Sequence, residues 1–253
     1  MGCKYGSHRV LEPKGVLPQP ALRLDNDFSR IEENEILVDV RALNIDSASF
    51  TQLEEAAGGD VSKIEAAILA IVAERGKMQN PVTGSGGMFI GTVAKVGAAL
   101  AGRDLKEGEK IASLVSLSLT PLRIDRIVKT HPEIDRVEIV GQAVLFESGI
   151  YAKLPDDMDE TLALAALDVA GAPAQAARLV KAGQSVLILG AGGKSGMLVA
   201  WEAMKRVGPA GRVVGNVYLP EDAATLAELG LCHEVVVADA TKPVALLDAV
   251  LAA

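Results

Sequence analysis

The chain has 253 residues, with 25 Lys and Arg against 33 Asp and Glu, a formal net charge of −8. This acidic balance argues against a protein that binds nucleic acid through a basic face. Hydrophobic residues make up 49% and charged residues 23%, which is typical of a globular protein and excludes a disordered one. Cys3 and Cys232 form no CxxC pair, which argues against a disulfide framework or a zinc knuckle. The opening residues, MGCKYGSHRV, have no apolar core, and the apolar runs are shorter than a membrane span, so we expect a cytoplasmic protein with no membrane partner.

The first part of the chain is rich in short strands. Residues 35–46, EILVDVRALNID, predict an apolar strand that leads into a polar turn. Residues 52–77 predict a helix with one apolar face, formed by Ile64, Ile68, Leu69 and Val72. A glycine-dense loop precedes the strand FIGTVAKVG, and further short strands with turns are predicted over 105–117 and 136–155. Together these elements predict a small, barrel-like β domain with a helical insertion over residues 1–155.

The second part, residues 156–253, has a different pattern. Residues 159–182 are alanine-rich and predict helix, broken near Gly171–Pro173. SVLILG carries no charge, which is typical of a strand buried on both faces. Strand and helix then alternate, in the order strand 185–190, helix 194–207, strand 211–218, helix 220–230, strand 232–240 and helix 242–253. This alternation predicts an α/β domain with a doubly wound parallel sheet.

The glycine turn between the first strand and helix of this part has the context of a dinucleotide site. Gly190 can turn tightly off the strand, Gly192 or Gly193 can let the backbone approach a pyrophosphate, and Gly196 allows close helix–strand packing. The spacing is GxGGxxG, so a tight turn without a ligand is the alternative interpretation. The predicted cofactor-binding residues are Gly190, Ala191, Gly192, Gly193, Lys194, Ser195 and Gly196, with Asn216 and Tyr218 after the second strand.

We predict that NAD is preferred to NADP. The acid expected about twenty residues past the glycine turn is missing near Asn216–Tyr218, where Asn216 is a weaker substitute. From Gly215 to Glu234 there is no Lys or Arg to hold a 2′-phosphate, and Glu221 and Asp222 would repel one.

A family resemblance rests on KLPDDMDETLALAALDVAG and LVKAGQSVLILGAGGKSGMLVAWEAM, preceded by EILVDVRALNID and LKEGEKIASL. With these segments in this order, the chain resembles the medium-chain dehydrogenase/reductase superfamily. The opening GCKYGSHRVLEPKGVLPQPALRLDN, with NIDSASF and GSGGMFIGTV, is similar to the L-erythro-3,5-diaminohexanoate dehydrogenases of lysine fermentation. The resemblance implies a GroES-like β-barrel domain beside a Rossmann domain.

The resemblance also implies NAD(P)-dependent oxidative deamination of a diamino acid, here L-erythro-3,5-diaminohexanoate, to 5-amino-3-oxohexanoate and ammonia. Two alternatives stay open: a zinc-independent enone or quinone reductase of the same superfamily, and a non-catalytic dinucleotide-binding protein. The chain is compatible with a homo-oligomer. A full Rossmann sheet needs three more strands, at about thirty residues per unit, so we expect this sheet to be incomplete.

Zinc-dependent members of the superfamily hold their metal with Cys, His and Glu at three stretches of the chain. Here these stretches read Asn44–Ser47, Gly84–Gly87 and Leu167–Ala170, and they contain no Cys or His. Hydroxyl and amide ligands would hold zinc poorly, so we expect a zinc-independent enzyme with no metal site.

A diamino acid needs an anion for its ammonium groups and a cation for its carboxylate, because burying either charge unpaired is costly. The alternative for Asp46 and Ser47 is that they cap the following helix, and for the opening segment that it is a solvated arm. The predicted catalytic residues are Asp168, Asp46, Ser47 and Ser85, and the predicted substrate-binding residues are Arg9, Glu12, Lys4 and Thr83.

Overall fold

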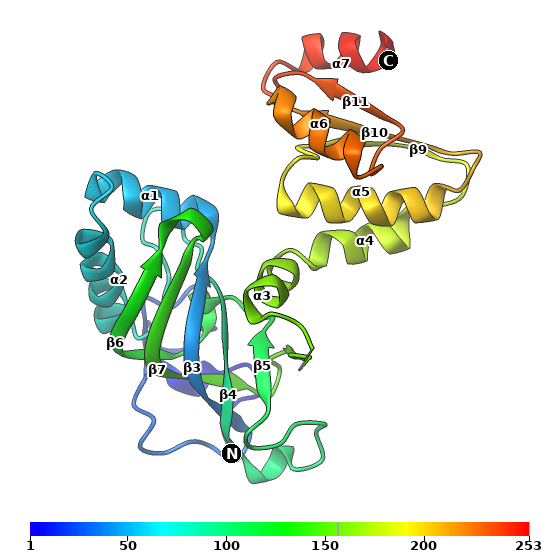
Figure 1. The fold of residues 1–253 in the computed structure, drawn as a ribbon. Coiled ribbons are helices and arrows are strands. Elements are labelled where there is room, and N and C mark those ends of the chain that lie inside the picture. The colour runs from blue at the N-terminus through cyan, green and yellow to red at the C-terminus, as the bar shows by residue number, and fades with distance from the viewer. Residues whose placement is uncertain (156, 253) are drawn as a thin grey trace. The chain divides into compact units, whose positions relative to one another are not determined.

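The computed structural model describes residues 1–155 and 157–252 (Figure 1). Residue contacts divide the chain into two compact units, a first unit over Met1–Leu164 and a second unit that begins at Ala165. Each unit is described separately below. The domain boundary between residues 155 and 156 stays a prediction.

The first unit is built on a six-stranded antiparallel sheet with the order β6-β7-β3-β4-β5-β8. The long strand β3 lies in the middle, between β4 and β7 (Figure 1). The strands are β3 (Glu35–Ile45), β4 (Gly87–Val96), β5 (Lys110–Ser113), β6 (Leu122–His131), β7 (Arg136–Phe146) and β8 (Tyr151–Lys153). Short 3₁₀ turns cover Ala98–Leu100, Leu117–Leu119 and Pro132–Ile134. Strand β6 was not predicted, because only Leu122 and Thr130 are buried on it and its sequence shows no sustained alternation of apolar and polar residues.

The predicted single helix over 52–77 is wrong, since the structure has two helices here. Helix α1 (Ser47–Ala57) ends at Gly58, in the left-handed conformation, and α2 (Val61–Arg75) begins after Asp60, whose side chain accepts from the Ser62 N–H at 3.0 Å. The buried face of α2 also differs from the predicted one. It includes Ile71 in place of the partly exposed Leu69, because positions 64, 68, 71 and 72 lie on one side of a helix.

Apolar side chains from α1, α2 and the sheet form the core of the first unit. Figure 1 shows both helices beside β6, β7 and β3. Phe50 of α1, Ile64 of α2, Phe89 of β4 and Ile111 of β5 are all buried. Burial of this apolar surface is the main force that holds the helices on the sheet.

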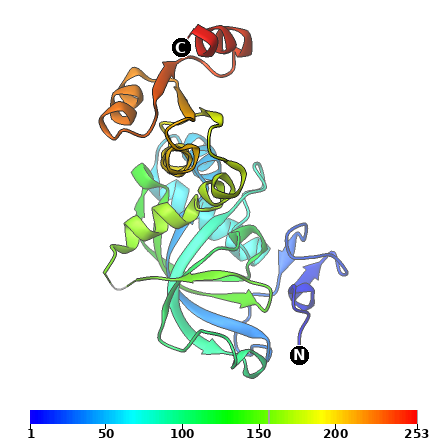
Figure 2. The same ribbon diagram turned by 90° about the vertical axis from the view of Figure 1, so that its right-hand side faces the viewer.

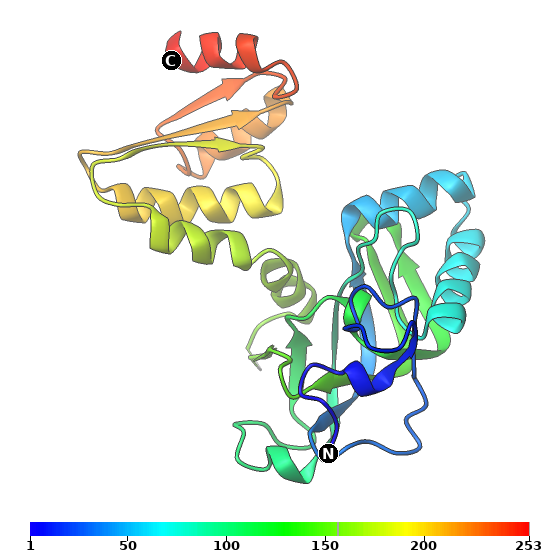
Figure 3. The same ribbon diagram turned by 180° about the vertical axis from the view of Figure 1, so that it is seen from behind.

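The N-terminal arm packs on one side of the first unit (Figures 2 and 3, dark blue). It contains a 3₁₀ turn (Ser7–Arg9) and an antiparallel pair of short strands, β1 (Val10–Glu12) and β2 (Arg23–Leu24). Val10, Ala21 and Leu24 form a small apolar cluster of their own. The arm is therefore an ordered part of the unit rather than a solvated tail.

Arg9 joins this arm to the central strand. Its Nε and Nη2 donate to the two carboxylate oxygens of Glu35 at 2.7 Å each, and its remaining donors reach the backbone oxygens of Asp27 and Arg30. Both side chains are buried. Burial alone would raise the pKa of the Glu35 carboxyl, but hydrogen bonds from Arg9 and from the Glu32 N–H hold this pKa below its ordinary value. The structure thus gives Arg9 a structural role in place of the predicted substrate contact.

The second unit contains a parallel sheet with the order β11-β10-β9. Helix α5 packs on β9 and β10, α6 packs on β10 and β11, and α4 lies beside α5 (Figure 1). The elements are α4 (Gly171–Leu179), β9 (Ser185–Leu189), α5 (Lys194–Val207), β10 (Arg212–Val217), α6 (Pro220–Glu228), β11 (Glu234–Val237) and α7 (Pro243–Ala252). Helix α3 (Glu160–Asp168) crosses the boundary between the units. The predicted fold class was a barrel-like β domain followed by an incomplete Rossmann-type sheet, and it is confirmed as an antiparallel sheet domain followed by the beginning of a parallel sheet.

Among the described residues, β9 lies at one edge of the three-stranded sheet with α5 packed against it, and its Leu187 and Leu189 are 44% and 58% exposed. Burial of β9 on both faces stays a prediction, because the sheet is expected to be incomplete. No helix among the described residues is long and apolar enough to cross a membrane.

Replacing Arg9 by Met should lower the free energy of unfolding by about 3 kcal/mol, because it leaves the Glu35 carboxylate buried without its main partner. Arg123→Met is a matched control: Arg123 also lies over the Phe28 ring, at 5.7 Å against 5.6 Å for Arg9, but it is half-exposed. The control should change stability by less than about 1 kcal/mol. Urea unfolding measures both changes, and equal effects of the two substitutions would contradict the assignment.

Candidate functional site

The glycine turn of the second unit has the geometry of a tight strand–helix connection. Gly190 follows β9 with a φ of +70°, which favours glycine, and Gly193 is the N-cap residue of α5. A methyl group added at Gly196 would lie 2.2 Å from the Gly190 carbonyl oxygen and 2.6 Å from the Cα of Ala191. Glycine at 196 is therefore needed for α5 to pack against the turn.

The same turn leaves room for a ligand at Gly193. A methyl group there would meet only the Gly190 oxygen, at 3.8 Å. The first N–H groups of α5, from Lys194, Ser195 and Gly196, have no acceptor within the helix and carry the positive end of its dipole. The Ala191 N–H, in contrast, donates to the Asn216 oxygen at 2.8 Å. The turn thus fits the phosphates of a dinucleotide, with the start of α5 as the donor group.

Asn216 has a structural role instead of the predicted contact with a ribose. It is buried, and its Nδ2 donates to backbone oxygens of Val236 at 3.3 Å and Ala238 at 3.0 Å, which joins β10 to the end of β11. Tyr218, also a predicted cofactor residue, is 70% exposed just after β10.

Asp222 is the acidic side chain that lies beside the glycine turn. A methyl group on Gly192 would lie 2.6 Å from the Asp222 Cγ, so this carboxylate lies against the glycine turn. Asp222 is in the first turn of α6. The sequence marked it only as a group that would repel a 2′-phosphate, because its contact with Gly192 depends on how β9, α6 and the turn meet in space.

The predicted catalytic residue Asp168 lies near the same turn. It ends α3, and its Oδ2 is 3.9 Å from the Nζ of Lys194, the first residue of α5. Both residues belong to the second unit. The structure therefore brings this candidate within ion-pair distance of a residue of the candidate cofactor turn.

In the first unit, three hydroxyl groups form a cluster. The Oγ of Ser49 lies 2.6 Å from the Thr83 Oγ1 and 2.6 Å from the Ser85 Oγ. Asn80 holds the loop in this position: its Nδ2 donates to the Ser49 carbonyl oxygen at 3.2 Å and its Oδ1 accepts from the Val82 N–H at 2.8 Å. Thr83 and Ser85 were predicted site residues, whereas Ser49 and Asn80 were missed. The pattern NxxTxS over residues 80–85, in the loop before β4 that we call the glycine loop, was a usable signal for Asn80.

Asp46 and Ser47 connect the end of β3 to the segments on either side of it. The Asp46 Oδ2 accepts from the Gly86 N–H at 3.1 Å, and the Ser47 Oγ donates to the Asp135 Oδ2 at 2.5 Å. Asp46 is the N-cap residue of α1, but no side-chain capping bond from it is found in the described structure. Its carboxylate fixes the glycine loop rather than the helix.

The arm reaches the glycine loop through main-chain atoms. The buried Lys77 Nζ donates to the carbonyl oxygens of Pro18 at 2.7 Å and Gln19 at 3.2 Å, and Gln79 Nε2 lies between the oxygens of Gln19 and Gly84. Burial, with a smaller contribution from Arg75, lowers the Lys77 pKa to about 8.

The remaining predicted arm residues lie on the surface. Lys4 lies over the ring of its neighbour Tyr5, at 4.8 Å, and Glu12 is exposed on β1. In the described structure, neither side chain is hydrogen-bonded to the hydroxyl cluster.

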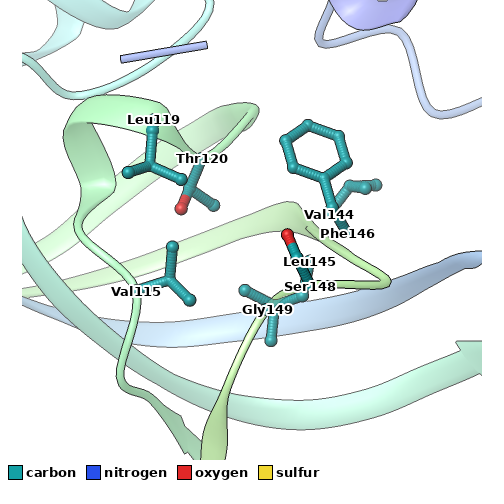
Figure 4. Close-up of a pocket in the computed structure, with 8 residues that line it drawn as sticks. All are labelled: Val115, Leu119, Thr120, Val144, Leu145, Phe146, Ser148 and Gly149. Atoms are coloured by element: carbon teal, nitrogen blue, oxygen red, sulfur yellow. The ribbon is translucent and has the colours of Figure 1, made fainter. Parts of the chain in front are cut away.

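Two pockets of the first unit do not involve the predicted site residues. The first, of about 190 Å³, is shown in Figure 4 and is lined by Val115, Leu119, Thr120, Val144, Leu145, Phe146, Ser148 and Gly149. The second, of about 460 Å³, is open and lies around Arg103, Asp104 and Lys153. The first has no charged side chain, which makes it a poor site for a zwitterion. In the second, the Lys153 ammonium is held by Asp104 and Glu109.

The fold alone resembles known reductases. The solved CurK enoyl reductase has a TM-score of 0.51 at 16% identity, over 84% of this chain and 54% of that one. A mycobacterial quinone oxidoreductase has a TM-score of 0.50 at 17% identity, over 87% of this chain and 55% of that one. The chain thus has the fold of these two reductases, with the glycine turn at the start of its parallel sheet.

Residues 8–155 match the N-terminal domain of L-erythro-3,5-diaminohexanoate dehydrogenase. Proteins of this name from Acetoanaerobium sticklandii and Fusobacterium nucleatum are each 68% identical over all 253 residues, which span 73% of their length. The chain therefore belongs to the L-erythro-3,5-diaminohexanoate dehydrogenase family, a family of amino-acid dehydrogenases, and the predicted resemblance is confirmed.

Substitution of two turn glycines separates folding from cofactor binding. Gly193→Ala should weaken dinucleotide binding by about tenfold or more with little change in melting temperature, because its methyl group would enter only the space for the ligand. Gly196→Ala should lower the melting temperature, because its methyl group would collide with the main chain of the turn. Cofactor titration and thermal unfolding test both; unchanged dinucleotide binding by Gly193→Ala would contradict the site.

Proposed function

We propose that this chain catalyses the NAD-dependent oxidative deamination of L-erythro-3,5-diaminohexanoate to 5-amino-3-oxohexanoate and ammonia. The observation that carries the proposal is 68% identity to two dehydrogenases of that name over the whole chain. The alternative of an enone or quinone reductase has only the fold in its support, at 16–17% identity. A fold of this kind is compatible with many activities.

The second unit supplies the cofactor site. The N–H groups at the start of α5 would hold the pyrophosphate of NAD, and Gly193 leaves the space for it. Bound there, NAD would supply the hydride acceptor for oxidation of the amine-bearing carbon.

Asp168 is the residue that we propose as the base or the ammonium anchor. A carboxylate suits both tasks, since it can accept a proton from the water that attacks the oxidised carbon or pair with an ammonium group. The ion pair with Lys194 holds Asp168 next to the glycine turn.

The first unit supplies polar groups for the substrate. The hydroxyl cluster of Ser49, Thr83 and Ser85 offers both donors and acceptors, which suits an unprotonated amine and water. The Asp46 carboxylate lies next to this loop through its bond with Gly86. We assign these residues to binding and orienting the reacting amine.

We further propose that the enzyme works without zinc. The described residues contain no group of three His, Cys, Asp or Glu side chains that could hold a metal ion. The stretches that correspond to the zinc-binding positions of metal-dependent relatives, Asn44–Ser47, Gly84–Gly87 and Leu167–Ala170, offer hydroxyl, amide and carboxylate groups but no Cys or His. Such a donor set binds zinc poorly.

The direct test is turnover of L-erythro-3,5-diaminohexanoate with NAD by the full-length enzyme. Turnover is measured from the absorbance of NADH and from the release of ammonia. We expect one ammonia for each NADH and the same kcat after dialysis against a strong chelator. Reduction of quinones or enones in place of this reaction would overturn the proposed activity. Loss of turnover on chelation that added zinc restores would overturn zinc independence alone.

Asp222 should determine the preference for NAD. Its carboxylate lies beside Gly192, where it can accept from ribose hydroxyl groups and repel a 2′-phosphate. Asp222→Asn should shift the kcat/KM ratio of NADP to NAD by about tenfold toward NADP, equivalent to about 1.4 kcal/mol. Glu221→Gln, in the same turn of α6, is the matched control and should leave the ratio nearly unchanged. An equal shift from both variants would mean that the net charge of α6, not Asp222, sets the preference.

A further inference from the structure

The proposed substrate carries a carboxylate, and the structure leaves it without the cation that the sequence predicted. The Arg9 guanidinium is fully engaged by Glu35 and two carbonyl oxygens, and Lys4 lies on the surface over Tyr5. A buried carboxylate without a cationic partner is strongly disfavoured. The inference below rests on the proposed function and supplies this missing cation.

Arg136, the first residue of β7, is a mostly buried arginine whose donors are incompletely used. Its side chain is 15% exposed. Nη1 donates to the Thr161 hydroxyl, and Nη2 lies 3.7 Å from the Glu138 Oε1, beyond hydrogen-bond distance. Nε is buried, and it alone among the buried side-chain nitrogens and oxygens of the described residues has no hydrogen-bond partner.

The charge of Arg136 is also weakly compensated. Two carboxylates act on it: Glu138, whose Oε1 is also 3.1 Å from the Nε2 of His131, and Asp159, which interacts with it electrostatically. In the described structure, neither carboxylate is hydrogen-bonded to Arg136. Arg9 shows the contrasting arrangement in the same unit, with two 2.7 Å bonds to one carboxylate. A buried N–H without an acceptor costs about 1–3 kcal/mol. A ligand carboxylate at the Nε and Nη2 edge would remove this cost, since a guanidinium fork matches a carboxylate in shape.

The position of Arg136 connects it to the candidate site. Asn44 of β3 is its partner in the β3–β7 register, so the two side chains lie on the same face of the sheet. Asn44 precedes Asp46 by two residues, and the Ile45 N–H donates to the Asp135 oxygen at 2.9 Å. The Asn44 amide and the Arg136 guanidinium therefore lie close in the sheet to Asp46, whose carboxylate binds the glycine loop.

We propose that Arg136, with the Asn44 amide beside it, binds the carboxylate of the diamino acid substrate. Arg136 supplies the charge and the bidentate geometry, and the Asn44 Nδ2 can donate a further hydrogen bond. This pair determines that the enzyme takes an amino acid rather than a simple diamine.

The test compares two substrates in the full-length enzyme: L-erythro-3,5-diaminohexanoate and 2,4-diaminopentane, which has the same two amines and no carboxylate. Arg136→Gln should raise the KM for the amino acid by about 10- to 100-fold, the loss expected for hydrogen bonds to a charged group. It should leave the kcat/KM for the diamine and the Kd for NAD unchanged. Arg136→Lys should recover part of the preference, because it keeps the charge and loses the fork.

Thr161→Val is the matched control, since it removes the hydroxyl partner of Arg136 and keeps the guanidinium. Its preference for the amino acid over the diamine should match that of the wild type. An unchanged preference in Arg136→Gln would overturn the proposal, as would an equal loss for both substrates. If Arg136→Gln does not fold, Arg136→Lys is the test, through the ratio of its kcat/KM for the amino acid to its kcat/KM for the diamine. Failure of the wild type to turn over the amino acid would instead overturn the proposed function.

Discussion

Strand β3 is fixed at both ends by charged side chains, and the polar groups of the first unit depend on this constraint. At its beginning, the buried Glu35 carboxylate binds Arg9 of the arm. At its end, Asp46 accepts from Gly86 on one side and Ser47 donates to Asp135 on the other. The buried ion pair at the beginning defines position well, because breaking it leaves an uncompensated charge, and the end is held by hydrogen bonds. One central strand therefore sets the positions of the arm, the glycine loop and the start of β7 together.

The proposed cofactor site of the second unit uses main-chain atoms, whereas the proposed substrate site of the first unit uses side chains. In the second unit, main-chain N–H groups at the start of α5 face the space beside Gly193, so backbone conformation matters most. In the first unit, side chains from separate segments supply hydroxyl, carboxylate, amide and guanidinium groups, among them Ser49 and Arg136. Such a set suits a substrate with two amines and one carboxylate, since each charged or polar group of the substrate needs a partner of its own.

Local patterns predicted most of the elements and the glycine turn, because hydrophobic periodicity and glycine spacing are properties of short segments. They failed where a residue's role depends on a distant partner. Arg9 and Glu35 pair across 26 positions, and nothing in the segment around Arg9 indicates a buried carboxylate. Asn216 lies within β10 and its side chain bonds inside the sheet, while Asp222 reaches the turn from α6. Short patterns thus predicted the glycine turn, whereas the contacts of Arg9, Asn216 and Asp222 depend on partners that are distant in the sequence.

The reactivity of the Lys77 amine reports whether the N-terminal arm is in place. Its amine is enclosed by the arm and bonds to the carbonyl oxygens of Pro18 and Gln19, whereas Lys14 in the arm itself is exposed. An acylating reagent reaches an enclosed amine only when the covering segment lifts, so its rate of modification follows local opening, as amide hydrogen exchange does. Mass spectrometry of Lys77 against Lys14 would therefore time the detachment of the arm in the working enzyme, with no label introduced.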